Sequence, residues 1–434
     1  MLLKGNCLEL LAEMPDNSVD SIVTDPPYEL GFMGKSWDNS GIAYSVELWS
    51  QALRVLKPGG HLLAFGGSRT YHRLASAVED AGFEIRDQIM WMYGSGFPKS
   101  LDVSKAIESS IKTGKSNSRS LRTIEQEGDG EPYQLAGKNN GIMGKSVIWD
   151  RKEFVPATSE AQQWQGWGTA LKPAHEPIVV ARKPLIGTVA TNVLTYGTGA
   201  LNIDGSRVAH QSDADRASAT PQGKVTVNKV GNMPDVENNG RKELSRPDTS
   251  LGRWPANVIH DGSEEVLEGF PITGSARPAR TGRAGGSNSE RSLGMTADHI
   301  GTWPADTGGS AARFFYCAKA SKSERNAGLE GLPEKPGGSN AKGYTQDVAN
   351  GLDRNRPVAN FHPTVKPIAL MRYLVKLVTP PNGTVLDPFL GSGTTAVAAI
   401  LEGFNWMGCE MTEDYWPIIE ARVVWAEAQP KTLL

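Results

Sequence analysis

Residues 383–395, GTVLDPFLGSGTT, join an apolar segment to a helical one through a loop that contains two glycines. The apolar run that ends at Asp387 predicts a buried strand, and residues 394–402 predict a helix. Gly391 and Gly393 allow the loop backbone to turn tightly and to approach a ligand closely. A helix start offers unpaired N–H groups and a positive dipole end, so this stretch predicts an α/β unit that binds an anionic group.

The same alternation of strands and helices extends over both ends of the chain. Near the start, the pattern predicts strands at 19–24, 61–65 and 83–93 and helices at 43–57 and 70–81. Near the end, it predicts strands at 383–387 and 406–410 and helices at 367–378, 394–402 and 412–426. Strands that alternate with helices are typical of a parallel, doubly wound sheet, so we expect an α/β, Rossmann-like fold.

The middle of the chain gives weaker signals. Four segments are rich in Gly, Ser, Asn and Arg and predict long loops: 113–147, 211–252, 273–310 and 333–356. Apolar runs at 175–182 and 312–319 predict two further strands between them.

The composition is that of a globular protein with two or three domains: 434 residues, 39% apolar and 21% charged. No run of 18 apolar residues predicts a membrane span, and the first residues do not resemble a signal peptide. Cys7, Cys317 and Cys409 are far apart, so neither a metal site nor a disulfide framework is expected, and a reducing cytoplasm fits. The net charge of −3 argues weakly against a nucleic-acid partner, since local clustering of positive charge matters more.

The loop around Gly391 suits a ligand that carries both an anion and a cation. Its amides and the helix start would meet a carboxylate, and Asp387 would hold an ammonium group. Glu410 stands 23 positions after Asp387 at the end of the next strand, where a carboxylate accepts both hydroxyls of a ribose. These features match S-adenosylmethionine. A Gly-x-Gly pair alone also fits a dinucleotide, whereas the lack of Gly-Lys-Ser/Thr disfavours a P-loop.

A second motif, Asp25-Pro26-Pro27-Tyr28, follows the strand predicted at 19–24. Each proline lacks an N–H group, so the carbonyls and the Asp25 carboxylate form a cluster of acceptors. An exocyclic amino group is a double donor, and its hydrogens would bind the Asp25 carboxylate and the Pro26 carbonyl. Tyr28 offers a flat ring on which a base can stack. Alone, the motif also fits a turn that ends a strand, but its presence beside the S-adenosylmethionine loop favours a binding pocket.

With both motifs present, the chain resembles the DNA methyltransferases that methylate exocyclic amino groups. The catalytic motif precedes the cofactor loop, as in the circularly permuted beta class of that family. The similarity covers residues 1–100, about 170–185 and 310–434, a little over half of the chain. It also includes the stretches KGNCLE at 4–9, HEPI at 175–178 and HPTVKP at 362–367.

The resemblance implies a site built from both ends of the chain, without a metal. It makes Asp25, Pro26, Pro27 and Tyr28 the catalytic residues. It forms the cofactor site from Asn6, Cys7, Asp25, His362, Pro363, Thr364, Lys366, Asp387, Pro388, Phe389, Gly391, Ser392, Gly393, Thr394 and Glu410. Family members usually carry Asp in place of Asn6, where it accepts a hydrogen bond from the cofactor adenine. The Asn6 carbonyl can accept the same bond.

The resemblance also divides the chain. It implies a catalytic half at 1–100, an insertion of unknown role at 101–169, a core strand at 170–185, a target-recognition region at 186–310 and a cofactor-binding half at 311–434. The segment between Pro98 and His175 is longer than is usual in the family.

The first letter of the catalytic motif indicates the target base. In the family, Asp-Pro-Pro-Tyr mostly accompanies adenine N6 methylation and Ser-Pro-Pro-Tyr cytosine N4 methylation. We therefore expect a site-specific adenine N6 methyltransferase that acts on a base flipped out of double-stranded DNA. Cytosine N4 methylation is the alternative. A silent DNA-binding protein with this fold is disfavoured by the intact motifs, and relatives acting on protein or RNA usually show Asn-Pro-Pro-Tyr.

Four arginines lie close together in the expected target-recognition region, with only Glu290 opposing them: Arg277, Arg280, Arg283 and Arg291. Arginine suits phosphates and guanine edges, so we expect DNA contacts here. Trp254 and Trp303 are expected in the core rather than as base stackers. The resemblance further implies a homodimer and a bacterial or phage modification enzyme in the cytoplasm, associated with the nucleoid.

Overall fold

The computed structural model describes residues 1–30, 38, 40–96, 100–114, 154–213, 215–216, 222–225, 251–273, 280–284, 299–303, 309–318, 323–336 and 357–430. The chain divides into two compact units. The first contains Met1–Gly94, His175–Glu330 and Thr364–Leu434, and the second contains Ser95–Ala174 and Gly331–Pro363. The functional division implied by the resemblance stays a prediction.

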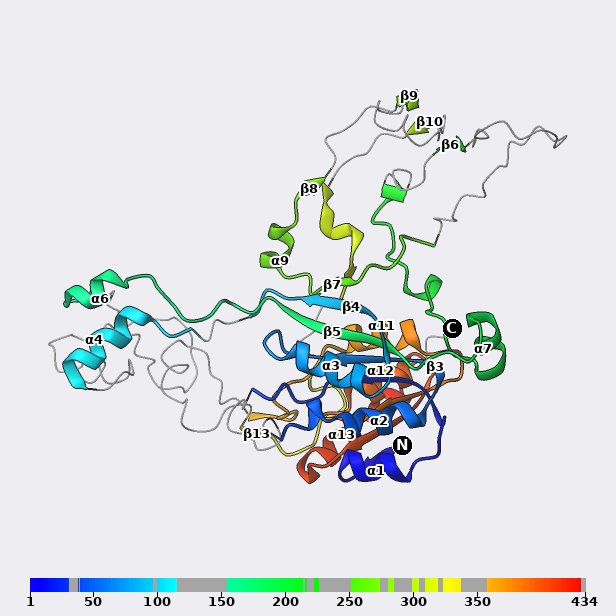
Figure 1. The fold of residues 1–434 in the computed structure, drawn as a ribbon, viewed down its shortest axis with the longest axis horizontal. Coiled ribbons are helices and arrows are strands. Elements are labelled where there is room, and N and C mark those ends of the chain that lie inside the picture. The colour runs from blue at the N-terminus through cyan, green and yellow to red at the C-terminus, as the bar shows by residue number, and fades with distance from the viewer. Residues whose placement is uncertain are drawn as a thin grey trace, which may run out of the picture. The chain divides into compact units, whose positions relative to one another are not determined.

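A nine-stranded sheet forms the centre of the first unit. Its order is β1 (Leu2–Lys4), β16 (Asn405–Glu410), β15 (Thr384–Asp387), β2 (Val19–Thr24), β3 (Leu56–Phe65), β5 (His175–Arg182), β4 (Glu84–Met92), β7 (Val258–His260) and β12 (Tyr316–Cys317). All neighbours are parallel except that β5 runs antiparallel to both β3 and β4. Figure 1 shows β5 beside β4. The order places the end of the chain beside its beginning, and the expected α/β sheet is confirmed.

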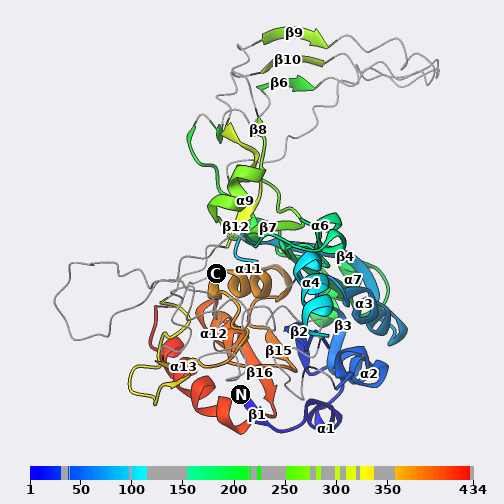
Figure 2. The ribbon, with the colours of Figure 1, turned by 90° about the vertical axis from the view of Figure 1, so that its left-hand side faces the viewer.

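Helices cover both faces of this sheet. The first layer is α1 (Cys7–Glu13), α2 (Val46–Val55) and α3 (Tyr71–Asp80). The second is α11 (Ile368–Val378) and α12 (Thr394–Leu401), with α13 (Trp416–Glu427) packed against α12. Figure 2 shows α11 and α12 on one side of the strands and α1 to α3 on the other.

The alternation of side chains along the central strands explains the two layers. Ile22 and Leu62 belong to the core under α1 to α3, while Val23 and Leu63 belong to the core under α11. All four are fully buried, and each such side chain contributes about 1.5–3 kcal/mol to stability. All six residues of β2 are buried, and its polar side chains are hydrogen-bonded, as Ser21 is to Thr379 and Thr24 is to Asp387.

The start of β3 corrects one prediction. The cluster Lys57–Gly60 was expected to separate a helix from a strand beginning at His61, but β3 already begins at Leu56. The backbone of Gly59 and Gly60 pairs with Lys183, with N···O distances of 3.1 and 2.9 Å. Gly59 has a φ of 77°, a conformation that glycine adopts readily, so the cluster stays in the sheet instead of leaving it.

The segment at 312–319 corrects a second prediction. It was expected to be a strand, but it begins as the 3-10 helix η6 (Ala311–Phe314), and only β12 is extended. The Ser310 hydroxyl caps η6 by accepting from Ala312 N at 3.2 Å. The buried Arg313 side chain lies 3.2 Å from Asp215, which holds the segment in this turn.

Short elements complete the first unit. They are η3 (Ile42–Tyr44), α7 (Val189–Tyr196), η4 (Asp204–Ser206), α9 (Glu264–Gly269), η7 (Glu413–Tyr415), the pair β8 (Ile272–Thr273) and β11 (Gly309–Ser310), and the antiparallel sheet β6 (Gln222–Val225), β10 (His299–Trp303) and β9 (Arg280–Ala284). The last sheet lies in segments that were expected to be loops.

The second unit contains α4 (Val103–Thr113), α6 (Ser159–Gln163), β13 (Lys335–Pro336) and β14 (Pro357–Val358). The buried Glu108 carboxylate of α4 accepts from the Thr158 N–H and hydroxyl at 3.1 and 2.8 Å, which ties α4 to the start of α6. Among the described residues of the whole chain, no helix is long and apolar enough to cross a membrane.

Candidate active site

The two sequence motifs meet at the carboxyl ends of neighbouring strands. β2 and β15 are parallel, with Ile22 opposite Leu386, so the carboxyl ends of the two strands lie side by side. The Thr24 hydroxyl donates to Asp387 Oδ1 at 2.6 Å, and Asp25 is the next residue. The catalytic motif and the glycine loop are therefore joined by a buried hydrogen bond.

Asp387 organises the glycine loop. Its Oδ2 accepts from the Thr395 hydroxyl at 2.5 Å, and its Oδ1 accepts from Phe389 N at 3.0 Å as well as from Thr24. Burial raises the pKa of this carboxyl to about 6, against the effect of the hydroxyl donors. The expected role of holding an ammonium group remains a prediction, since three donors of the chain itself already occupy this carboxylate.

Glu410 supports the loop from the neighbouring strand. Its carboxylate accepts from Gly391 N at 2.8 Å and from Thr412 N at 2.7 Å. Burial raises the pKa of Glu410. Gly391 and Gly393 have φ values of 56° and 81°, so both use the left-handed conformation that glycine permits. Leu390 N also donates to Cys409 O at 2.9 Å, so two successive loop amides bind the end of β16.

The first residues of the chain also lie at the end of β16. β1 pairs with β16, with Lys4 opposite Glu410, and Gly5 N donates to Glu410 O at 3.0 Å. Asn6 begins α1 as its N-cap, with Oδ1 accepting from Leu8 N at 2.9 Å. Cys7 is buried, which raises the pKa of its thiol to about 11. A carbonyl oxygen has two lone pairs, so capping leaves Asn6 able to accept a second bond.

Arg422 is a buried residue that the sequence did not single out. Its Nη1 donates to Ser392 O at 2.7 Å, to Ser392 Oγ at 3.1 Å and to Thr394 Oγ1 at 3.0 Å. Burial lowers the pKa of this guanidinium to about 10. An isolated arginine in a predicted helix does not indicate that it binds a loop elsewhere in the chain, yet Arg422 holds the loop at Ser392 and Thr394.

A charged cluster lies at the catalytic motif. Lys366 Nζ is 2.6 Å from Asp25 Oδ2 and 3.4 Å from Glu176 Oε2, and it donates to the Tyr28 hydroxyl at 3.3 Å. The Tyr28 hydroxyl donates to Glu176 Oε2 at 2.9 Å. The sequence placed Lys366 in the cofactor site and did not single out Glu176 as a site residue. The structure brings both to the carboxylate of Asp25, whose catalytic role stays a prediction.

The second oxygen of Asp25 has a different environment. Oδ1 is buried and has no hydrogen-bond partner among the described residues. Desolvation raises the pKa of Asp25, and the nearby Lys366 ammonium works against that rise. Although desolvation opposes it, the carboxylates of Asp25 and Glu176 raise the pKa of Lys366. A buried acceptor without a donor is costly, so Oδ1 has the chemistry of a binding position.

Tyr28 is clamped at both ends. Its carbonyl accepts from the Thr70 hydroxyl at 3.0 Å and from the Tyr44 hydroxyl at 3.3 Å, while its own hydroxyl is bound to Glu176. A Cβ at Gly67 would lie 3.2 Å from the Tyr28 ring, so the glycine leaves room for the ring there. The ring orientation is thereby fixed.

Residues 19–421 match a protein-family model described as DNA methylase, of the N6/N4 type. The chain belongs to this family. The resemblance inferred from the motifs is thus confirmed.

Two curated bacterial proteins show local similarity to this chain. The type II methyltransferase M.ScaI of Streptomyces caespitosus is 40% identical over 82 residues, which are 19% of this chain and 27% of that protein. The putative methylase YubD of Escherichia coli is 48% identical over 89 residues, 17% and 39% respectively. The chain therefore matches well under half the length of these relatives.

Solved structures of DNA methylases align over nearly all of the chain. The complex of M1.HpyAVI with S-adenosylmethionine is 14% identical, with coverage of 97% and 98% and a TM-score of 0.36. The cytosine-N4-specific PvuII methyltransferase is also 14% identical, with coverage of 97% and 85% and a TM-score of 0.40.

Other predicted residues have different contacts or lie outside the described residues. His362 and Pro363 belong to the second unit, where His362 N donates to Asn360 Oδ1 at 3.3 Å, while Thr364 belongs to the first. Arg280 and Arg283 lie in β9, with their backbones opposite Trp303 and Ile300 of β10. Arg277 and Arg291 lie outside the described residues, so the expected DNA contacts stay predictions.

Trp254 corrects a third prediction. It was expected in the core, but 63% of its surface is exposed. The Arg207 guanidinium lies 5.4 Å from the centre of its ring, a cation–π contact that partly covers the indole. The side chain of Trp303 is not described.

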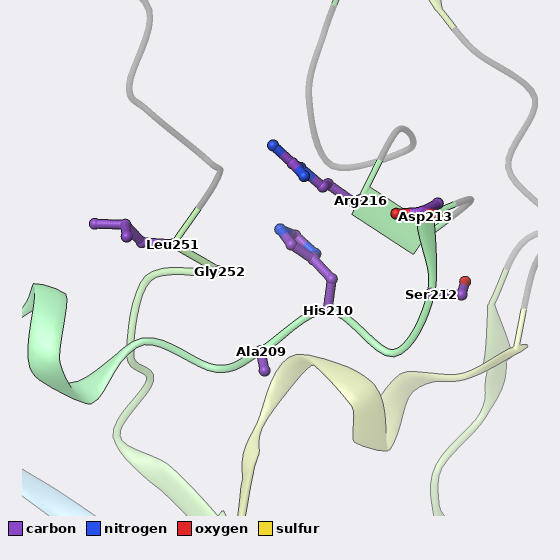
Figure 3. Close-up of a pocket in the computed structure, with 7 residues that line it drawn as sticks. All are labelled: Ala209, His210, Ser212, Asp213, Arg216, Leu251 and Gly252. Carbon is purple, nitrogen blue, oxygen red and sulfur yellow. The ribbon is translucent and has the colours of Figure 1, made fainter.

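A hollow of about 400 Å³ lies within the expected target-recognition region. It is lined by Ala209, His210, Ser212, Asp213, Arg216, Leu251 and Gly252, and Figure 3 shows His210 and Arg216 beside it. Next to the lining residues, Asp215 accepts a hydrogen bond from Arg253 Nη1 at 2.8 Å. This contact lowers the pKa of Asp215 to about 2. No residue of the two motifs lines this hollow, so the active-site assignment rests on the strand ends and not on it.

Proposed function

We propose that the protein transfers a methyl group from S-adenosylmethionine to the exocyclic amino group of a base in double-stranded DNA, with adenine N6 as the target. The observation that carries this proposal is that Asp25 Oδ1 is buried and has no hydrogen-bond partner among the described residues. The glycine loop lies next to it, because Thr24, the residue before Asp25, is hydrogen-bonded to Asp387. Membership of the DNA methylase family supports the reaction class.

The catalytic motif acts by accepting hydrogen bonds. Asp25 Oδ1 accepts one hydrogen of the amino group and the Pro26 carbonyl accepts the other, while Pro26 and Pro27 present no competing donor. These bonds draw the nitrogen lone pair out of conjugation with the ring and direct it at the incoming methyl group. Holding the two reactants in line lowers the barrier without metal chemistry, since positioning alone can supply several kcal/mol.

The cofactor residues fit the group chemically. The loop of Gly391 and Gly393 lets the backbone come close to a ligand, and the start of α12 favours its carboxylate. The lone pairs of Glu410 that its two backbone donors leave free suit the ribose hydroxyls. When bound, S-adenosylmethionine supplies an electrophilic methyl group, whose bond to sulfur breaks as the bond to nitrogen forms, and the nitrogen then releases one proton.

The clamped ring of Tyr28 gives the base a surface for stacking. A paired base inside a duplex cannot reach a strand-end pocket, so the target base leaves the helix at a cost of a few kcal/mol. Base–aromatic stacking of about 1–3 kcal/mol offsets part of that cost. A homodimer in the bacterial cytoplasm, acting on both strands of a symmetric site, completes the proposal.

Cytosine N4 is the second candidate target, because it offers the same two donors to the same acceptors. Mass spectrometry of nucleosides from plasmid DNA, incubated with the protein and S-adenosylmethionine, separates the two. N6-methyladenine supports the proposal, and N4-methylcytosine keeps the mechanism but changes the base. The absence of any methylated base on DNA of varied sequence contradicts the proposed activity.

A further inference from the structure

Lys366 and Glu176 reach the catalytic carboxylate from two distant parts of the chain. Lys366 precedes α11, and Glu176 lies in β5. We propose that these two residues are a positioning pair for Asp25: Lys366 holds Oδ2 and keeps the carboxylate charged, and Glu176 fixes Lys366. Oδ1 is thereby left to the target amino group. This inference rests on the proposed function.

The ammonium of Lys366 is fully engaged. It has three N–H donors, and three oxygens surround it: Asp25 Oδ2 at 2.6 Å, the Tyr28 hydroxyl at 3.3 Å and Glu176 Oε2 at 3.4 Å. It also lies 4.9 Å from the centre of the Phe65 ring. Only 9% of the side chain is exposed, so Lys366 is held in one place and leaves no donor for Oδ1.

The engagement of Asp25 is one-sided. Oδ2 accepts from Lys366, whereas Oδ1 has no partner in the part of the chain that the structure describes. A carboxylate held at one oxygen keeps its plane and presents the other in a fixed direction. Lys366 therefore orients the acceptor that the target amino group needs, without contacting the base itself.

Charge is the second part of the arrangement. The groups that face Asp25 are Lys366, Glu176 and Tyr28, together with Asp387 from the glycine loop, while Tyr93 of the β4 end faces Glu176 and Lys366. Lys366 stabilises the ionised form of Asp25, and Glu176 destabilises it. A protonated Asp25 carries a hydrogen of its own and is a poorer acceptor for an amino group. The two partners thus act on the same ionisation in opposite directions.

The opposite effects of Lys366 and Glu176 on the ionisation of Asp25 can be tested with two substitutions. Methylation requires ionised Asp25, so its rate is high above the pKa of that group and falls as the pH drops through it. Lys366→Met removes the stabilising charge and moves this acid limb to higher pH. Glu176→Gln removes the destabilising charge and moves the limb to lower pH, while the glutamine carbonyl still accepts from Tyr28. A residue that served only to hold the fold together would not move the two limbs apart.

The experiment is a pH profile of the single-turnover methylation rate, with calorimetric binding of S-adenosylmethionine as a second readout. For Lys366→Met we expect at least a tenfold loss of rate at pH 7, partial recovery at higher pH, and cofactor affinity within about threefold of wild type. Lys366→Arg should restore part of the lost rate. Lys376→Met is the matched control, because Lys376 lies on α11 and pairs with Glu402, 3.1 Å away, and its profile should match that of the wild type.

Each outcome of the pH profiles either supports or overturns the positioning pair. Acid limbs displaced in opposite directions support the positioning pair. Limbs that stay in place, or that move in the same direction, overturn it, as does wild-type activity in Lys366→Met. If Lys366→Met does not fold, the Glu176→Gln limb alone decides in the same way. A wild-type protein that methylates no base overturns the proposed function, which is a separate result from an active wild type with unmoved limbs.

Discussion

The Thr24 hydroxyl donates to Asp387 Oδ1 across 2.6 Å, although 363 positions separate the two residues in the chain. This bond joins the residue before the catalytic motif to the residue that opens the glycine loop. The two sequence motifs therefore share a buried hydrogen bond at the carboxyl ends of β2 and β15. In the proposed function, this bond places the site for the methyl donor beside the site for the target base.

Replacing Thr24 should destabilise the protein more at high pH than at low pH. The pKa of Asp387 is raised from 3.8 to about 6, chiefly by burial, so its stabilising contribution is present below about pH 4 and is lost as the pH rises through 6. The Thr24 hydroxyl favours the ionised form, so Thr24→Val raises this pKa further. We expect a loss of about 2 kcal/mol at pH 8 and about 1 kcal/mol at pH 5, measured by urea unfolding.

Ser21→Ala is the matched control for Thr24→Val. Ser21 lies on the same strand and shares a buried bond of 2.8 Å with Thr379, but neither group is charged. Its cost of about 1 kcal/mol should not depend on pH over this range. An equal loss at both pH values for Thr24→Val would contradict the coupling to Asp387.

A methyl group at Gly391 should weaken cofactor binding beyond its effect on folding. Gly391→Ala places alanine at a φ of 56°, which costs about 1–2 kcal/mol, and fills the space beside the ligand. Gly403→Ala has a similar backbone cost at a φ of 79°, but nothing lies within 4 Å of its added Cβ. Calorimetry should show at least a tenfold weaker affinity for Gly391→Ala only. Equal affinities would place the cofactor elsewhere.

Arg422→Met should separate cofactor binding from stability. The guanidinium fixes Ser392 and Thr394, but its Nε and Nη2 have no hydrogen-bond partner among the described residues. Removing a buried, partly unsatisfied charge can leave stability nearly unchanged, while the loop loses its support. We expect about a tenfold weaker affinity for S-adenosylmethionine and a small change in melting temperature.

Val424→Ala, at an exposed position of the same helix, is the control for Arg422→Met and should bind the cofactor as the wild type does. A large loss of stability in Arg422→Met with unchanged affinity would mean that Arg422 serves the fold and not the loop.

Local sequence patterns predicted most of the central fold. The strands Val19–Thr24 and His175–Arg182 match their predicted bounds, because apolar runs between breakers specify buried strands. The start of β3 was missed because a Pro-Gly-Gly cluster normally ends an element, and only tertiary pairing with Lys183 keeps it in the sheet. The exposed Trp254 was missed because size and apolarity do not reveal a covering arginine.

The motifs predicted the proposed site, and the roles of its residues stay a prediction, but the contacts within it depend on the fold. The approach of Lys366 to Asp25 requires segments 341 positions apart to meet, and no local periodicity reports on that. Glu176 belongs to a stretch that the resemblance marked as family-like, yet its contact with Tyr28 depends on β5 inserting between β3 and β4. The sequence predicted the type of reaction, whereas it did not predict which charged side chains contact one another.

The most direct test of the central claim compares the wild type with Asp25→Asn, which keeps the size of the side chain and removes its charge. Transfer of labelled methyl groups to DNA and calorimetric binding of S-adenosylmethionine are measured on both proteins. If Asp25 is the acceptor for the target base, only the wild type methylates DNA, and both proteins bind the cofactor within about threefold of each other. Methylation by Asp25→Asn at the wild-type rate, or loss of cofactor binding in that variant, would contradict the assignment of Asp25 as the acceptor for the target base.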